Sequence, residues 1–100
     1  MAKAYWVARV DVHNDEGYKE YAAHNPAIFK KFGAKYVVRG GKYDGVEGQS
    51  RSRNVVIEFA DYATAVACYK SPEYQANLKI RQANAVTDLL IIEGYDGPQP

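Results

Sequence analysis

The chain has 100 residues, of which 47% are hydrophobic and 25% are charged, a composition typical of one globular domain. Its 13 basic and 12 acidic residues are interspersed and nearly balance, so we expect no strongly basic surface for nucleic acid or for an anionic membrane. The apolar runs, such as residues 89–92, are far shorter than the roughly 20 residues that cross a bilayer. A single cysteine and the lack of an apolar signal region predict a cytoplasmic protein.

The first third of the chain is predicted to form a strand and a broken helix. Residues 4–12 alternate with the period of two that is typical of a strand. Asn14 or Asp15 can cap a helix, in which side chains at helical spacing follow: Tyr18, Tyr21, Ala22, Asn25 and Phe29. Because proline lacks an N–H and disfavours helix in the residue before it, we expect a break at Pro26. A second short helix is then predicted from Pro26 to Phe32, closed by Gly33.

The middle of the chain is predicted to form two strands joined by a glycine-rich connection. Residues 35–39 and 53–59 have the composition and alternation of strands. Gly40 and Gly41 indicate a bulge or turn, after which residues 42–47 can continue as an extended arm. These glycines match neither a dinucleotide nor a phosphate-loop fingerprint, so we interpret them as turn residues.

The last third is predicted to form a second broken helix and a final strand. Asp61 can cap the first part of the helix. Ser71 followed by Pro72 then signals a new helix, which combines a capping side chain with proline at the first helical position and extends to about Ala83. Residues 87–95 are predicted to be the last strand.

This order of elements favours an α+β fold of the ferredoxin-like βαββαβ type. Two right-handed crossovers on one antiparallel sheet place the first and third strands at its centre and both helices on one face. We expect a single ferredoxin-like domain over residues 1–96 and a mobile tail over residues 97–100.

The two faces of the predicted sheet differ in composition. The helices are expected to cover one apolar face, formed by Trp6, Ala8, Val10, Val55, Ile57 and Phe59. The other face mixes apolar and charged side chains, and from the last strand it is expected to carry Ile91 and Glu93. Such a face suits a second copy of the sheet, so a face-to-face homodimer is predicted. On it, Arg9, Glu58 and Glu93 can form either an acid–base pair or a salt bridge between subunits.

Five segments resemble the family labelled domain of unknown function 1330. They are Lys3–Val12, Val38–Gly41, Arg53–Phe59, Cys68–Gln75 and Glu93–Asp96, with Arg-Gly-Gly and Ser-Pro-Glu-Tyr as the most specific motifs. The resemblance covers nearly the whole chain and implies a dimeric α+β barrel. Its superfamily includes cofactor-free monooxygenases, muconolactone-type isomerases, haem-handling enzymes and ligand-sensing domains, so the fold selects no single chemistry. No catalytic residue is carried over from it.

The connection between the two middle strands is rich in charge. Arg39, Glu47, Arg51 and Arg53 surround it, and two or three of them can converge on a small carboxylate or enolate. The alternative is a structural ion-pair cluster that holds the glycine-rich arm. We predict Arg39, Arg53 and Glu47 as substrate-binding residues.

Outside that connection, the candidate site residues lie on the helices. His24 can act as an acid or base near neutral pH, or it can be an exposed residue at a helix end. Tyr69, Tyr74 and Arg81 are predicted on the second helical layer, where the tyrosine hydroxyls can line a cleft between helix and sheet, although aromatic residues at helical spacing are also typical of a core. Cys68 is expected to be a buried, inert thiol. No metal-ligand spacing occurs, so neither a metal nor a cofactor is predicted.

Two functions remain open at this point. The first is a cofactor-free enzyme, of the isomerase or monooxygenase type, that acts on a small polar or aromatic metabolite with His24 as the catalytic residue. The second is a non-catalytic binding or assembly module that uses the same arginines for a small acid. Binding of RNA to an open sheet through exposed aromatic residues is a third idea, which the balanced charge opposes.

Overall fold

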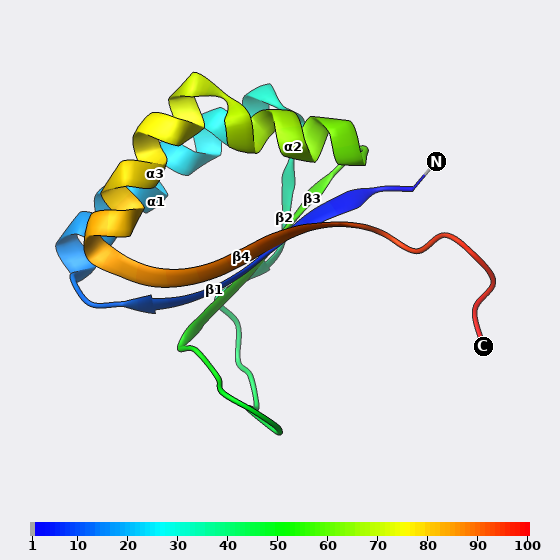
Figure 1. The fold of residues 1–100 in the computed structure, drawn as a ribbon, viewed down its shortest axis with the longest axis horizontal. Coiled ribbons are helices and arrows are strands. Elements are labelled where there is room, and N and C mark those ends of the chain that lie inside the picture. Colours follow the sequence, from blue (N-terminus) through cyan, green and yellow to red (C-terminus); the bar gives the residue numbers. More distant parts are fainter. Residues whose placement is uncertain (1) are drawn as a thin grey trace.

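The computed structural model describes residues 2–100, which form a four-stranded antiparallel sheet with helices on one face (Figure 1). The elements are β1 (Ala4–Val12), α1 (Asp15–Lys31), β2 (Lys35–Arg39), β3 (Arg53–Phe59), α2 (Tyr62–Lys70), α3 (Pro72–Asn84) and β4 (Ala85–Glu93). The strand order β2-β3-β1-β4 confirms the predicted ferredoxin-like arrangement, with β1 and β3 at the centre. None of the helices in residues 2–100 is long and apolar enough to cross a membrane.

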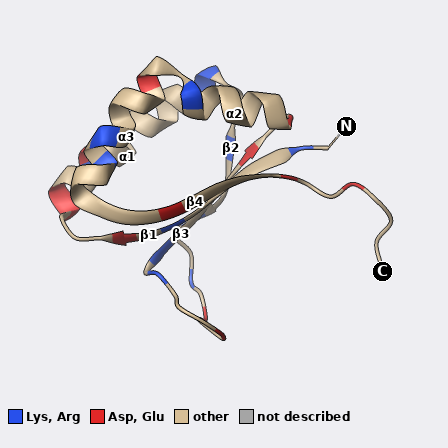
Figure 2. Cartoon of the chain, in the orientation of Figure 1, with Lys and Arg blue, Asp and Glu red and all other residues tan. Residues whose placement is uncertain are grey.

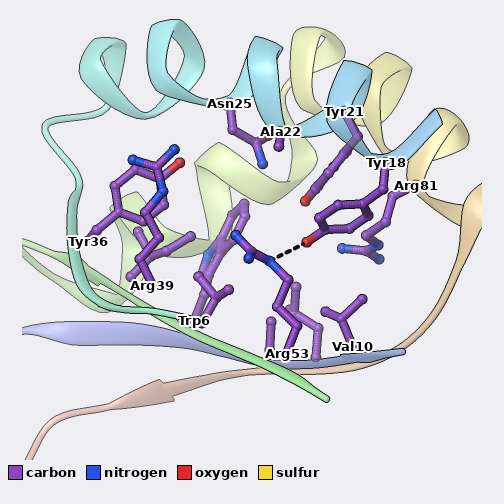
Figure 3. A pocket seen from close by; sticks show the side chains of 14 residues that line it. Trp6, Val10, Tyr18, Tyr21, Ala22, Asn25, Tyr36, Arg39, Arg53 and Arg81 are labelled. Carbon is purple, nitrogen blue, oxygen red and sulfur yellow. Dashed lines mark hydrogen bonds between the residues drawn. The ribbon is translucent and has the colours of Figure 1, made fainter. Parts of the chain in front are cut away.

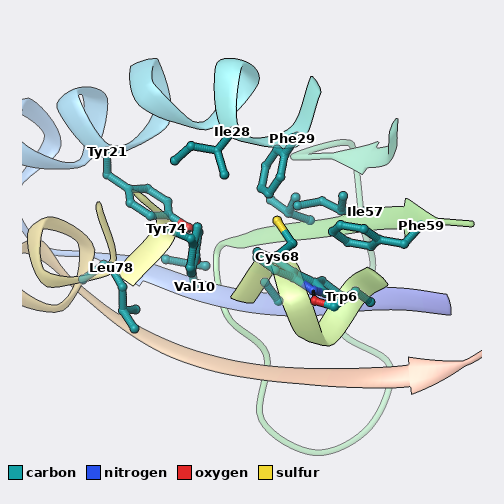
Figure 4. Close-up of a cluster of buried hydrophobic side chains, with 14 of the residues drawn as sticks. Trp6, Val10, Tyr21, Ile28, Phe29, Ile57, Phe59, Cys68, Tyr74 and Leu78 are labelled. Carbon is teal, nitrogen blue, oxygen red and sulfur yellow. Dashed lines mark hydrogen bonds between the residues drawn. The ribbon is translucent and has the colours of Figure 1, made fainter. Parts of the chain in front are cut away.

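The core lies between the helices and the apolar face of the sheet (Figure 4). Trp6 is at its centre: its ring packs against Phe29, Phe59 and Tyr74, and its Nε1 donates a 2.9 Å hydrogen bond to the carbonyl of Ala65 in α2. That bond satisfies the one polar atom of the indole where no water is available. The predicted inner face of β1 and β3 is therefore confirmed.

Cys68 belongs to the same core. Its side chain has no exposed surface, and burial raises the pKa of the thiol to about 12. A thiol in that state is neither a nucleophile nor a metal ligand at neutral pH, as expected from its position on the helix.

The predicted break of the first helix at Pro26 is wrong, because α1 continues through this residue to Lys31. Pro26 lies on the exposed side of the helix. On the buried side, Asn77 of α3 donates to the carbonyl of Tyr21 at 3.0 Å and to Oδ1 of Asn25 at 2.9 Å. These bonds tie α1 to α3 just before the proline, so packing against α3 supports the helix although Pro26 cannot donate to the carbonyl of Ala22.

The break in the second helix is confirmed. Ser71 separates α2 from α3, and its hydroxyl accepts from the backbone N–H of Tyr74 at 3.3 Å while Pro72 occupies the first turn of α3. Asp61 caps α2 in the same way, through a 2.7 Å bond from the N–H of Thr64.

The predicted orientation of the last strand is also wrong. Trp6 pairs with Ile91, which places Ile91 on the helix-covered face, and Glu93 lies on that face as well because it pairs with Ala4. An acid–base pair or salt bridge of Glu93 with Arg9 and Glu58 on the other face is therefore not formed. Residues 89–92 are apolar at every position, so alternation could not decide which of them face the helices.

The face of the sheet away from the helices is called the open face below. One row of apolar side chains crosses it through all four strands, as the pairs Val38–Val56, Val56–Val7 and Val7–Leu90 show. Val86 and Ile92 flank this row and are about half exposed. The segment between β2 and β3, residues 40–52, projects on the same side (Figure 1).

Candidate functional site

A pocket lies between α1 and the helix-covered face of the sheet (Figure 3). Its cavity volume is about 30 Å³, room for about two water molecules, so the side chains that line it must move apart to admit a larger ligand. The residues that line it come from six elements: Trp6, Ala8 and Val10 of β1, Tyr18, Tyr21, Ala22 and Asn25 of α1, Tyr36 and Arg39 of β2, Arg53, Val55 and Ile57 of β3, Arg81 of α3, and Leu89 of β4.

Aromatic rings form much of the wall of this pocket. Tyr18 and Tyr21 follow each other on the inner side of α1, with ring centroids 5.4 Å apart, and Tyr36 faces them from β2. Trp6 forms part of the floor (Figure 3). Flat apolar walls of this kind suit a planar, largely apolar molecule.

Three arginines supply the charge of the pocket, and no acidic residue lines it. Arg39 lies over the ring of Tyr36 at 4.2 Å. Arg53 reaches up from β3 and donates from Nε to the hydroxyl of Tyr18 at 3.2 Å (Figure 3). Within residues 2–100, none of the three arginines takes part in an ion pair.

Arg81 is the most unusual of the three because only 6% of its surface is exposed. Its Nη1 donates to the hydroxyl of Tyr74 at 2.9 Å, and its guanidinium lies 5.6 Å from the ring centroid of Tyr21. Its Nε–H is buried and has no acceptor among the described residues. A buried cation with only neutral partners is costly, by about several kcal/mol, unless an anion binds beside it.

The tyrosines of the pocket act as hydrogen-bond donors rather than as bases. Burial raises the pKa values of Tyr18 and Tyr36 above the ordinary value of 10.0, although Arg53 and Arg39 partly oppose this effect. Burial also raises the pKa of Tyr74, which lies behind the lining. Their hydroxyls therefore keep their protons at neutral pH, and those of Tyr18 and Tyr36, which line the pocket, can donate hydrogen bonds to a ligand oxygen.

The structure brings together only part of the predicted site. Arg39 and Arg53 both line the pocket. Glu47 does not: it lies in the exposed segment 40–52, beside a hollow that Arg9 and Asn54 also line. Tyr74 is fully buried and contributes through its hydrogen bonds, whereas Tyr69 packs edge-on against Trp6.

The predicted catalytic residue His24 lies outside this pocket. Its side chain is 56% exposed and its Nε2 is 3.9 Å from Oε2 of Glu20. Together with Ile28, Glu73 and Ile80 it lines a separate groove between α1 and α3 on the outer side of the helices. Its role as an acid or base stays a prediction.

Arg51 forms ion pairs that hold the fold together and lies outside the pocket. Its guanidinium bonds to the carboxylates of Asp11 and Asp88, each at 2.8 Å, on the side of the open face. The backbone N–H of Ser52 also donates to Asp11, and this contact is the main cause that lowers the pKa of that carboxyl. This cluster ties the end of segment 40–52 to β1 and β4. Acids and bases are otherwise spread over helices and strands (Figure 2).

Sequence reasoning did not assign Tyr18, Tyr21, Tyr36 and Arg81 to the pocket. A signal was present for two of them, because Tyr18 and Tyr21 share the inner side of the predicted helix. Arg81 was grouped with Tyr69 and Tyr74 on the second helical layer, but its burial in the pocket could not be predicted, since it depends on how α1 and α3 pack. Among the residues that the structure describes, no group of three or more metal ligands occurs.

Comparison with known proteins gives a family and a fold. A family model described as domain of unknown function (DUF1330) matches residues 3–95, whereas no curated protein matches the chain. A solved structure of a protein of unknown function from Rhodopseudomonas palustris is similar over 96% of this chain and 85% of its own, with 18% identity and a TM-score of 0.78.

Two further solved structures share the fold. SnoaB, a cofactor-independent oxygenase from Streptomyces nogalater, is 12% identical with a TM-score of 0.63, over 100% of this chain and 97% of its own. A dimeric ferredoxin-like protein of unknown function from Thermobifida fusca is 14% identical with a TM-score of 0.50, over 92% of this chain and 89% of its own. At these identities the likeness concerns the fold alone.

Proposed function

The chain belongs to the DUF1330 family, and from the geometry of its pocket we propose that it binds a small organic anion with a planar, apolar body. The observation that carries this proposal is the buried guanidinium of Arg81, which has no acidic partner within residues 2–100. A ligand carboxylate or other oxyanion supplies the missing negative charge. The aromatic rings of Tyr18, Tyr21 and Tyr36 then cover the body of the ligand.

The other two arginines support the same ligand class. Arg39 and Arg53 lie nearer to solvent than Arg81, and neither has a carboxylate partner among the described residues. Charges at the mouth of a pocket attract an anion and raise the rate of its entry. We therefore expect Arg81 to bind the negative charge of the ligand at the buried end of the pocket. Arg39 and Arg53 are expected to attract the ligand at its mouth.

Isothermal titration calorimetry with benzoate and benzamide tests this proposal, because the two molecules share their shape and differ in charge. Benzoate is expected to bind at least about tenfold more tightly than benzamide. Arg81→Met should abolish that difference, whereas Lys79→Met, which removes an exposed charge from the same helix, should preserve it. Equal binding of the two probes, or an unchanged preference in Arg81→Met, would contradict the proposal.

A second candidate function is a cofactor-free enzyme, which the likeness in fold to the oxygenase SnoaB favours. Such an enzyme needs a group that accepts a proton, and the pocket lining contains neither a carboxylate nor an imidazole. Binding is therefore the function that the pocket supports best. Chromatography can show whether the protein converts any anion that it binds into a product. Turnover by the wild-type protein that is lost in His24→Ala would favour the enzyme. No turnover by either the wild-type protein or the variant would favour the binding module.

We also propose that the protein is a homodimer through the open face. The apolar row from Val38 to Leu90 crosses all four strands and is left uncovered by the single chain. A second copy of the same sheet offers a matching surface. The dimeric protein from Thermobifida fusca has a similar fold, which supports this arrangement.

A further inference from the structure

Three side chains at the inner end of the pocket, Arg81, Tyr74 and Tyr21, form a continuous chain of hydrogen bonds. Nη1 of Arg81 donates to the hydroxyl of Tyr74 at 2.9 Å, and that hydroxyl lies 2.6 Å from the hydroxyl of Tyr21. Tyr74 has no exposed surface and does not line the pocket, whereas Tyr21 and Arg81 both line it. The chain therefore runs from a buried cation, through a buried phenol, to a phenol at the wall of the pocket.

The direction of the Tyr21–Tyr74 hydrogen bond follows from counting donors. If Tyr21 donated, the hydroxyl of Tyr74 would accept two bonds, and its own proton would be buried without an acceptor. If Tyr74 donates, its proton is satisfied, and the proton of Tyr21 remains available to the pocket. The second arrangement leaves no buried donor unpaired on Tyr74 and is the favourable one.

The positive charge of Arg81 strengthens this arrangement. An arginine that donates to the oxygen of Tyr74 makes the O–H of Tyr74 a better donor, and the effect passes on to the O–H of Tyr21. The Nε–H of Arg81 is buried and also lacks an acceptor within residues 2–100, so the charge of this guanidinium is not balanced there. A free hydroxyl donor beside a buried positive charge forms a site for an oxygen that carries negative charge.

We propose that Tyr21, supported by Tyr74 and Arg81, donates a hydrogen bond to an ionised enol or phenol oxygen of the ligand at the inner end of the pocket. This inference rests on the proposed function and narrows its ligand class. A hydroxyl donor bonds more strongly to a more basic oxygen, and enolate and phenolate oxygens are more basic than carboxylates. Tyr21 contacts the ligand in this account, whereas Tyr74 is a positioning residue.

Absorption spectroscopy with 4-nitrophenol tests the inference, because only the ionised form of this probe absorbs strongly in the visible range. Bound to the wild-type protein, the probe is expected to have its pKa lowered by about one unit, which corresponds to about a tenfold preference for the phenolate. Tyr21→Phe should lose most of that shift, and Tyr74→Phe should lose a smaller, measurable part. Tyr62→Phe removes an exposed hydroxyl on α2 and should keep the full shift.

Both test variants keep the aromatic ring, so the packing around Trp6 is preserved and circular dichroism can verify the fold. A full shift in Tyr21→Phe and Tyr74→Phe would overturn the inference. Binding of benzoate without binding of 4-nitrophenolate would also overturn it, while the proposed function would stand. If the wild-type protein bound neither anion, the proposed function and this inference would both fail.

Discussion

The Nε of Arg53 in β3 donates a hydrogen bond of 3.2 Å to the hydroxyl of Tyr18 in α1. The same guanidinium lies 5.5 Å from the centroid of the Tyr18 ring. This pair joins the first helix to the sheet at one side of the pocket, and it fixes the direction of an arginine that would otherwise move freely. This one contact therefore both joins α1 to β3 and orients an arginine of the proposed ligand site.

Tyr18→Phe removes this hydrogen bond and keeps the ring. We expect a loss of about 1 kcal/mol in the free energy of unfolding, measured by urea denaturation, because a typical net hydrogen bond contributes that much. Benzoate affinity should fall as well, since Arg53 loses its fixed orientation. Tyr62→Phe is the matched control and should change neither quantity. An unchanged unfolding energy in Tyr18→Phe would mean that the bond is not formed in solution.

Stability is expected to fall at alkaline pH because of the buried phenols. Burial raises the pKa values of Tyr18 and Tyr36 in the folded state above the unfolded value of 10.0, so the folded chain holds these protons more tightly. Their contribution to stability is present below pH 10 and is lost as the pH rises through the folded pKa values. Urea unfolding at a series of pH values from 8 to about 11 should show this decline. The double variant Tyr18→Phe, Tyr36→Phe should show a shallower decline, and an identical slope would refute the assignment.

Asn77→Ala should be among the more destabilising single substitutions in the chain. It removes the donor to the carbonyl of Tyr21 and to Oδ1 of Asn25, and it leaves that side-chain oxygen of Asn25 buried without a donor. An unsatisfied buried acceptor costs about 1–3 kcal/mol, so we expect a loss of about 2 kcal/mol in unfolding free energy. Gln75→Ala removes a part-buried bond to the carbonyl of Tyr69 and should cost about 1 kcal/mol or less. Equal losses in the two variants would contradict this account of α1.

Leu90→Lys is predicted to separate the homodimer. Leu90 ends the apolar row on the open face and is 52% exposed in the single chain, so a lysine there leaves the core intact. Sedimentation equilibrium should give twice the chain mass for the wild-type protein and the single mass for the variant. Tyr62→Lys, on an exposed position of α2, should remain dimeric. A wild-type protein that sediments as a monomer would rule out the proposed dimer.

The sequence predicted the order of the elements because strands and helix caps are local signals. Trp6, Ile57 and Phe59 were placed on the covered face from alternation alone. Alternation failed for residues 89–92, where every position is apolar and only pairing with β1 sets the face. The predicted break at Pro26 was wrong, because α1 is held against α3 by contacts such as the bond from Asn77, which no local pattern reveals.

The site was predictable only in part. Arg39 and Arg53 were found because they flank one short connection, so proximity in sequence implied proximity in space. Tyr21 and Arg81 come from different helices, and their meeting depends on how α1 packs on α3. No local pattern distinguishes a buried arginine from an exposed one on a helix, so this part of the pocket required the structure.

The most direct test of the central claim is a crystal structure of the protein purified without exchange of its native ligands. We predict a small planar molecule between Tyr21 and Tyr36, with a negatively charged oxygen in contact with the guanidinium of Arg81. The contradicting result is a closed pocket in which a carboxylate of a partner subunit pairs with Arg81. That pairing would make the buried charge part of an assembly interface rather than of a ligand site.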